Sequence, residues 1–528
     1  MTDDIVEPTK PVEEPQAEQP YRLPYLGLAG IGLLAIGIVV WQIVANQGSG
    51  TWQWLNLILV PGALIVGAYL LAQVLRKTEL DIARSQETQA VLDNYFNRIS
   101  RLMLENDLRN AAYDDEAARV ARAQTLTVLP KLNGRAKGEV VRFLYESGML
   151  DAEAPVISLV GADLSSAELG RLVMPSISLR GANLQGANLE RCDLSSSDLR
   201  NADLVASEMS EVRLTGSYLR GANLEKATLT DAVLTEAVLT KARLSGARLQ
   251  RAALGEANLT GANLKNADLT EAVLAGAKLG DADMSGATMN EADLTLANLS
   301  DAILDKASLI GGNLSGANLT GARMVGVHLE RSLLSGAVLS EVDMTGAYLR
   351  EANLALANLR GATLNQVVAP GSNLRDAIMG RVAMSGSDFS GADLSRANLS
   401  VANLSRALLD RANLEEAGLS GADLRASQLR GAILRGAILR GAILGDADLS
   451  RADLTKANLR WANLSQATLT GAELVEVDLT DAEVTQEALS KAKIVTRATQ
   501  PETGRFEPRP PARNPQPASA TTQSQTKS

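Results

Sequence analysis

The sequence predicts an all-β repeat domain that follows a helical N-terminal region, and three observations lead to this prediction. From Leu159 to Val484 every fifth residue is Leu, Met, Phe or Val, with the single exception of Ala369. A period of five fits neither regular element, because residues five apart are rotated by about 140° in an α-helix and lie on opposite faces of a strand. The chain must therefore turn a corner every five residues. Two long uncharged stretches, 23–45 and 52–75, precede the repeats.

The repeat also has a motif. A small residue stands two positions before the large apolar residue in most copies, as in GANLQGANL (181–189) and GADLSRANLSVANLSRALLDRANL (391–414). Tandem A(D/N)LXX units resemble the pentapeptide repeat proteins, and the resemblance covers residues 156–484. It implies a right-handed quadrilateral β-helix with one pentapeptide per side and four per coil. In that fold the large apolar residue and the small residue both point inward.

Neighbouring coils of such a domain bury one continuous core that no single coil could form. Representative core residues are Leu184, Leu264, Leu394 and Leu434, and Cys192 fills one of the small inward slots. At about 4.8 Å per coil, the rod would be roughly 80 Å long.

One segment departs from the repeat. In NQVVAPGSNL (365–374), Ala369 replaces the large apolar residue and Pro370 follows it. Because proline donates no ladder hydrogen bond, we expect a bulge or local bend there. It would be either a partner site or a tolerated irregularity.

Arginines follow a pattern near the C-terminal end, in LRGAILRGAILRGAIL (429–444). Residues 20 apart stack on one side, so these arginines form a ring round one coil. The ring consists of Arg425, Arg430, Arg435 and Arg440. Arg440 stacks near Arg460 and lacks a stacked carboxylate. We favour a solvated surface here, and the alternative is that Arg440 and Arg460 are surface contacts that bind an anion.

The other arginines of the ring have acidic residues one coil earlier. Arg430 stacks over Asp410, and Arg435 stacks over Glu415. We expect these stacked pairs to form surface ion pairs, each worth a few tenths of a kcal/mol.

The two uncharged stretches predict a transmembrane hairpin, with a buried core helix as the alternative. Each exceeds the roughly 20 residues that span a bilayer. Basic residues flank the pair, and the connecting loop has none. The positive-inside rule then places both termini and the rod in the cytoplasm. We expect an integral protein of the plasma (inner) membrane, with the bilayer as the partner of residues 23–75.

The segments between these regions are predicted as helices or tails. The stretch RAKGEVVRFLYESG (135–148) indicates a helix that ends at Gly148. The region before the repeats resembles the membrane-proximal segment of bacterial membrane-anchored pentapeptide repeat proteins. The predicted segments are a disordered acidic tail (1–20), two transmembrane helices (21–77), a cytoplasmic helical cap (78–155), the β-helix (156–484), a C-terminal capping helix (485–494) and a disordered tail (495–528).

The residue types argue against catalysis. His328 is the only histidine and Cys192 the only cysteine, so neither a metal site nor a nucleophile with its base is indicated. We predict no catalytic residues, no cofactor and no metal. One cysteine also permits no internal disulfide.

The remaining hypotheses concern binding. The favoured one is a membrane-tethered rod that serves as a scaffold for an unidentified protein partner. One alternative is an accessory subunit of a membrane transporter or channel. The other is imitation of DNA to inhibit a type II topoisomerase, which some pentapeptide repeat proteins do. It is disfavoured, and no nucleic-acid partner is expected, because acidic side chains only modestly outnumber basic ones in the repeats.

Overall fold

The computed structural model describes residues 53–150 and 155–499, with side chains from residue 65 onward except at 80, 81, 84 and 494. The chain divides into two compact units, residues 1–90 and 91–528. Helix α2 (Gln53–Glu105) begins in the first and ends in the second. The predicted tail 1–20 and the predicted span 23–45 fall outside the described residues, and so does most of the predicted C-terminal tail. Among the helices that the structure describes, none is long and apolar enough to cross a bilayer.

The helical part of the second unit comes before the repeats. It consists of the end of α2, η1 (Leu108–Asn110), α3 (Glu116–Val128), η2 (Leu129–Lys131) and α4 (Gly134–Glu146). On α2, Leu92, Tyr95 and Ile99 are buried, as their helical spacing predicts. The Tyr95 hydroxyl is 2.8 Å from Oγ1 of Thr125 on α3, which links the two helices.

Helix α4 covers the first coil of the repeats. Asn133 begins the helix, and its side chain accepts a hydrogen bond from the Ala136 amide at 2.9 Å. The Gly134 carbonyl accepts a 2.9 Å hydrogen bond from the amide of Glu168 on the rod. The Lys137 ammonium donates to the Ser165 carbonyl at 3.0 Å. The helix therefore supplies partners for an end of the ladder that would otherwise be open.

The end of α4 lies close to the prediction. Gly148 has a φ of 73°, its amide bonds to the Tyr145 carbonyl, and the Met149 amide bonds to the Leu144 carbonyl. These are the two bonds of a Schellman motif, for which glycine is the favoured residue. The last helical residue is Glu146, two positions before the predicted end.

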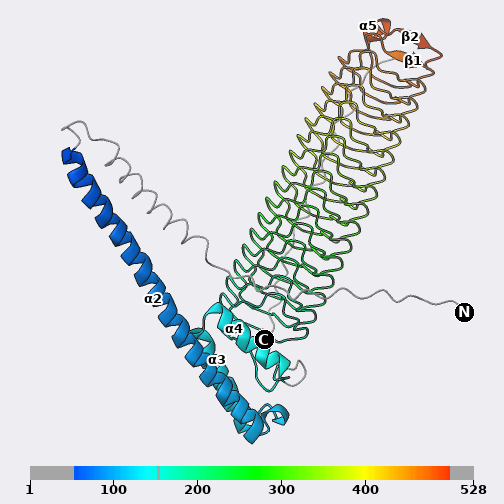
Figure 1. The fold of residues 1–528 in the computed structure, drawn as a ribbon. Helices are drawn as coiled ribbons and strands as arrows, with labels where there is room; N and C mark the ends of the chain where they lie inside the picture. The colour runs from blue at the N-terminus through cyan, green and yellow to red at the C-terminus, as the bar shows by residue number, and fades with distance from the viewer. Residues whose placement is uncertain (1–52, 151–154, 500–528) are drawn as a thin grey trace, which may run out of the picture. The chain divides into compact units, whose positions relative to one another are not determined.

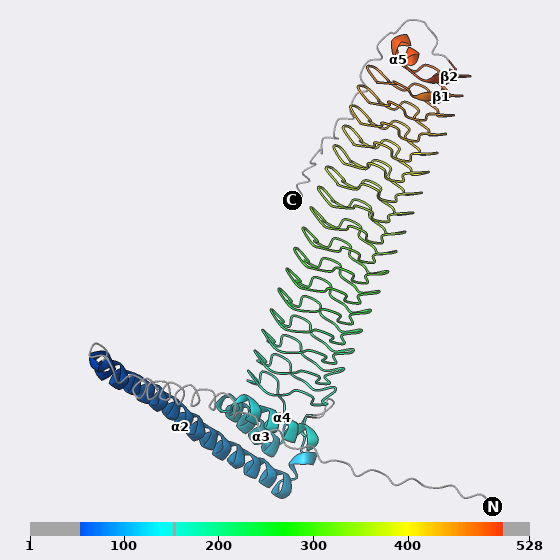
Figure 2. The ribbon, with the colours of Figure 1, turned by 45° about the horizontal axis from the view of Figure 1, so that its top comes forward.

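The repeats form a β-helix of stacked coils (Figures 1 and 2). Its ladder consists of parallel bridges between residues 20 apart, from Asp163–Asn183 to Asn463–Glu483, so four pentapeptides make one coil. Leu184, Leu264, Leu394, Leu434 and Cys192 are each at most 1% exposed. Since both inward positions of nearly every repeat are filled in this way, only the outer surface remains available for contact.

Each corner is a tight turn with a left-handed residue two positions after the central one. That residue has a φ between 52° and 72° throughout the rod. At one typical corner, Gly186 has a φ of 60°, and the Ala187 amide donates to the Leu184 carbonyl at 3.0 Å. Glycine adopts this conformation without strain, which explains why it is common there.

The Asp or Asn of the motif has a structural role at the corner. The amide just after the central residue joins no backbone ladder. Instead it donates to the side chain two residues earlier, as the Gln185 amide does to Asn183 Oδ1 at 3.2 Å and the Ser165 amide to Asp163 Oδ1 at 3.0 Å. The Asp or Asn side chain of the motif thus accepts a hydrogen bond from a backbone amide that has no partner in the ladder.

The bulge predicted at Ala369 and Pro370 is wrong. Bridges on both sides keep the 20-residue register, and the Pro370 carbonyl accepts from the Glu351 amide at 3.1 Å. Proline lacks a backbone N–H. At this position, just after the central residue, the ladder does not use the N–H. Accordingly, Val368 replaces Asp or Asn before this corner, and Val173 does so before the other corner proline, Pro175.

A smaller irregularity lies beside Pro370. Val367 fills a slot that is usually Ala, and its amide donates to Ser387 Oγ at 3.1 Å. That hydroxyl donates in turn to the Leu364 carbonyl at 2.5 Å. The Ser387 hydroxyl, from the next coil, thus bridges the two backbone groups of this corner.

The C-terminal end differs from the predicted capping helix at 485–494. Helix α5 (Gln486–Ser490) is shorter, and Leu489 on it is buried. Strand β2 (Ile494–Thr496) then pairs in parallel with β1 (Glu473–Val475). The Thr499 amide also donates to the Val477 carbonyl at 3.0 Å. The ladder therefore continues past the helix into residues that the sequence assigned to a disordered tail.

Candidate functional site

The ring of arginines occupies corner positions of one coil, but its ion pairs differ from those predicted. Arg430 Nε lies 2.6 Å from Asp448 Oδ2, and Arg435 Nε lies 2.5 Å from Asp453 Oδ2. Both carboxylates belong to the next coil, 18 residues later. The predicted side-chain pairs with Asp410 and Glu415 do not form.

The reason is the direction in which a corner side chain leans. It reaches across to the residue just before the central position of the neighbouring coil, which is a diagonal neighbour. Lys265 and Asp283 pair in the same way at 2.9 Å. Asp410 instead accepts the backbone amide of Arg430 at 2.9 Å.

Other charged residues pair directly along the corner columns. Arg251 forms two hydrogen bonds of 2.7 Å to the Asp231 carboxylate. Arg191 and Glu211 pair likewise at 2.7 Å. These pairs neutralise acidic groups along the outside of the rod.

Acid should weaken the Asp231–Arg251 pair. The hydrogen bonds from Arg251 hold the pKa of Asp231 below its usual range. The pair therefore adds stability above the unfolded pKa of about 4, and this is lost as pH falls through the lower folded value. Since the pair is exposed, we expect Asp231→Asn to cost a few tenths of a kcal/mol near pH 7 and nothing in strong acid. Urea unfolding of both proteins across this pH range measures the difference, and an equal difference at every pH would contradict the prediction.

Arg440 and Arg460 meet at an aromatic side chain that the sequence argument missed. Their guanidinium carbons lie 4.9 Å and 5.0 Å from the centre of the Trp461 ring. The Trp461 indole N–H donates to Asp481 Oδ2 at 3.0 Å. The ring is half exposed and is held between cation–π contacts from two successive coils.

Arg440 and, one coil later, Arg460 lack the short ion pairs that the other three arginines of the ring form. Among the described residues no carboxylate forms an ion pair with Arg440, and the nearest to Arg460 Nε is Asp478 at 4.0 Å. That nitrogen has no hydrogen-bond partner. Arg425, by contrast, is bound to Asp423 at 2.5 Å.

Exposed apolar residues surround the same corner. Val401, Gly421, Gly441 and Trp461 follow one another in a corner column, linked coil to coil by backbone hydrogen bonds. Ile438 and Ile443 lie on the two faces that meet there. We name this surface the Trp461 corner; its side chains are those of Val401, Ile438, Arg440, Ile443, Arg460 and Trp461.

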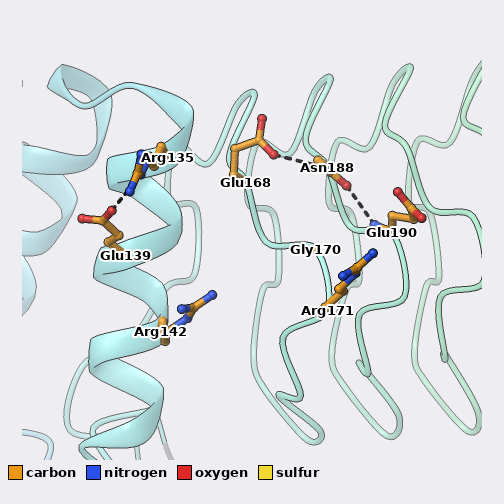
Figure 3. Close-up of a pocket in the computed structure, with 8 residues that line it drawn as sticks. All are labelled: Arg135, Glu139, Arg142, Glu168, Gly170, Arg171, Asn188 and Glu190. Carbon is orange, nitrogen blue, oxygen red and sulfur yellow. Dashed lines mark hydrogen bonds and ion pairs between the residues drawn. The ribbon is translucent and has the colours of Figure 1, made fainter. Parts of the chain in front are cut away.

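A polar cleft of about 510 Å³ lies between α4 and the first coils (Figure 3). Arg135 pairs with Glu139 at 3.2 Å, and the Asn188 side-chain Nδ2 donates to Glu168 Oε2 at 3.1 Å. Figure 3 shows Arg142 and Arg171 on opposite sides of Gly170, with their guanidinium groups not directed at one common point. With both signs of charge mixed along its walls, this cleft presents no convergent site for one ligand.

His328 is bound to its neighbours on the outer surface. Its ring stacks on Tyr348 with centroids 4.5 Å apart, and Nδ1 lies 3.2 Å from Glu330 Oε1. In the part of the chain that the structure describes, no group of three or more His, Cys, Asp or Glu residues could hold a metal ion.

Cys192 should be unreactive in the folded protein. It is fully buried in a small inward slot, and burial, assisted by the charge of Asp193, raises its thiol pKa to about 12. We expect Ellman's reagent at pH 8 to label it only after unfolding in guanidinium chloride. Rapid labelling of the native protein would contradict its placement. A Cys192→Ala variant, which carries the usual residue of this slot, is the unlabelled control.

The similarity of this chain to known proteins lies in its repeats. The pentapeptide repeat family matches residues 157–490 in overlapping segments. HetL, a regulator of heterocyst differentiation from the cyanobacterium Nostoc sp. strain PCC 7120, is 27% identical over 63% of this chain and 95% of its own, with a TM-score of 0.15. QnrB1, a plasmid-mediated fluoroquinolone resistance protein, is 18% identical over 41% and 90%, with a TM-score of 0.25. Rfr23 from the cyanobacterium Cyanothece 51142 is 31% identical over 20% and 64%, with a TM-score of 0.13.

Comparison with curated protein sequences finds no match. The family match spans more than half of the chain and coincides with the 20-residue ladder and with the buried positions of the repeat. The chain therefore belongs to the pentapeptide repeat family.

Proposed function

We propose that the protein is a non-enzymatic scaffold that holds a pentapeptide-repeat rod at the cytoplasmic face of a plasma (inner) membrane. The observation that carries the proposal is the burial of both inward positions along the rod. A coil so filled leaves its outer surface for function, and repeat rods of this kind commonly serve as interaction surfaces.

The membrane tether rests on the sequence alone, because no helix that the structure describes is long and apolar enough to cross a bilayer. The stretches 23–45 and 52–75 are uncharged, and the basic residues that flank them favour cytoplasmic termini. The helical segment, residues 78–150, would then stand between the bilayer and the first coil.

The surface charge favours a protein partner over imitation of DNA. Ion pairs such as Arg191–Glu211 and Arg251–Asp231 alternate the sign of charge along the corner columns. A DNA-binding protein responds to dense negative charge, which these columns do not provide.

Membrane fractionation tests the tether. We expect the full chain to stay in the membrane pellet after an alkaline carbonate wash. We also expect protease to cut the rod in inverted vesicles and spare it in spheroplasts. Release by carbonate would contradict the tether, and digestion in spheroplasts would contradict the orientation.

Cross-linking in native membranes tests the scaffold. Recovery of soluble proteins in amounts that match the chain supports it. Recovery of a transporter or channel instead supports the accessory-subunit alternative, and inhibition of a type II topoisomerase by the purified chain supports imitation of DNA.

A further inference from the structure

We propose that the Trp461 corner binds an acidic segment of a partner protein, with carboxylates on Arg440 and Arg460 and an apolar side chain against Trp461. This inference rests on the proposed function and names the site and the chemistry of its partner.

Exposed apolar residues occur along the whole rod, and some of them stand in corner columns. Two corner columns carry the same pattern, a large apolar residue, two glycines and a second large apolar residue. The patterns are Leu296–Gly316–Gly336–Leu356 and Val401–Gly421–Gly441–Trp461. The second also has arginines at its end and isoleucines on both adjoining faces, so it combines the residue types that are enriched at interface hot spots.

Gly421 and Gly441 have no side chains, so the surface of the corner column is recessed between Val401 and Trp461. A Cβ added at Gly441 would meet nothing within 4 Å, and one added at Gly421 would meet only Val401 at 3.9 Å. Three coils separate Val401 from Trp461, which is about 14 Å at 4.8 Å per coil. An extended segment of about four residues matches this length.

Trp461 lies on the surface of the rod and forms no part of its core. It is 50% exposed, and its φ of 59° is the ordinary value for a corner of the rod. The two positions before it in the column are glycines. An exposed tryptophan at a corner that glycine could occupy is explained by contact with a partner rather than by stability.

The positive charge of Arg440 and Arg460 indicates the chemistry of the partner. Arg425, Arg430 and Arg435 each pair with a carboxylate at 2.5–2.6 Å, whereas among the described residues Arg440 forms no ion pair and the Asp478 carboxylate lies 4.0 Å from Arg460. Carboxylates from outside can therefore bind them. The exposed Val401, Ile438 and Ile443 favour apolar side chains beside those carboxylates, which a polypeptide supplies and a nucleic-acid backbone does not.

Peptide selection tests the inference without a known partner. The probe is a random peptide library displayed on phage and selected on the full-length protein in mild detergent. We expect the selected peptides to combine Asp or Glu with an aliphatic or aromatic residue. We also expect their binding, measured by fluorescence anisotropy, to weaken as salt rises.

Matched variants locate the binding. Trp461→Gly installs the usual corner residue and should fold normally, yet lower peptide affinity roughly tenfold or more. Leu356→Gly makes the same kind of change on the other column and should leave affinity within about twofold. Arg440→Gln should weaken binding and its salt dependence, whereas Arg425→Gln, at an already paired arginine, should not.

Three results would overturn the inference. The first is equal peptide binding by Trp461→Gly and wild type. The second is preference of the wild-type corner for a single-stranded oligonucleotide over the selected peptides. The third is a dimer that Trp461→Gly abolishes, because a second copy would then occupy the surface. If the same soluble proteins cross-link to wild type and Trp461→Gly, the scaffold stands and this site fails; if none cross-links to either, the scaffold itself fails.

Discussion

Replacing Leu264 by alanine is expected to lower the stability of the rod by about 2–5 kcal/mol. Leu264 is fully buried, and its amide bonds to the Asp283 carbonyl of the next coil at 2.7 Å. Shortening its side chain leaves a cavity in the middle of a continuous core, where close packing on all sides limits collapse. Because each coil contacts only its neighbours, the loss should be local. Hydrogen exchange should therefore accelerate most at the amides of residues 244–284.

The matched control is Leu296→Ala. Leu296 has the same side chain but stands at a corner and is 71% exposed. Its truncation should change stability by at most about 0.5 kcal/mol. Equal effects of the two substitutions on urea unfolding and on exchange would mean that the central positions do not form the core.

The five-residue spacing of the large apolar residues predicted the core of the rod, because this spacing determines which side chains are buried. A large apolar residue at every fifth position requires the chain to turn after each pentapeptide, and the resemblance to the pentapeptide repeat proteins supplied the number of four sides per coil. The exception, Ala369, did not disturb the ladder. Its neighbour Pro370 occupies the one position whose amide the ladder never uses, and the sequence pattern alone did not identify that position as free.

The surface was harder to predict because its contacts depend on the direction of side chains. Stacking by 20 residues placed Arg430 over Asp410, but the side chain of Arg430 leans forward to Asp448. Trp461 was missed because the argument looked for a carboxylate near Arg440 and not for a ring. One signal was present in the sequence: a tryptophan stands in a corner column just after two glycines.

The packing of α4 on the first coil depends on glycine for a steric reason that the spacing of residues in the sequence does not reveal. Replacing Gly138 by alanine is expected to push α4 off the first coil. A Cβ added at Gly138 would lie 2.1 Å from the Glu168 carbonyl oxygen, and one at Gly134 would lie 2.0 Å from that of Ser166. Both clashes are with backbone, so no side-chain rotation relieves them. We expect Gly138→Ala to destabilise the cap by about 1–3 kcal/mol or more, although alanine is the better helix former.

Hydrogen exchange at Glu168 reports on this contact, since its amide donates to the Gly134 carbonyl on α4 at 2.9 Å. In Gly138→Ala that amide should exchange faster, while amides in the middle of the rod should be unchanged because neighbouring coils hold them. Arg142→Ala introduces the same residue on an exposed position of the same helix and should leave Glu168 protected. If Gly138→Ala leaves both its thermal midpoint and Glu168 exchange at wild-type values, α4 does not seat on the first coil, and the rod must end in another way.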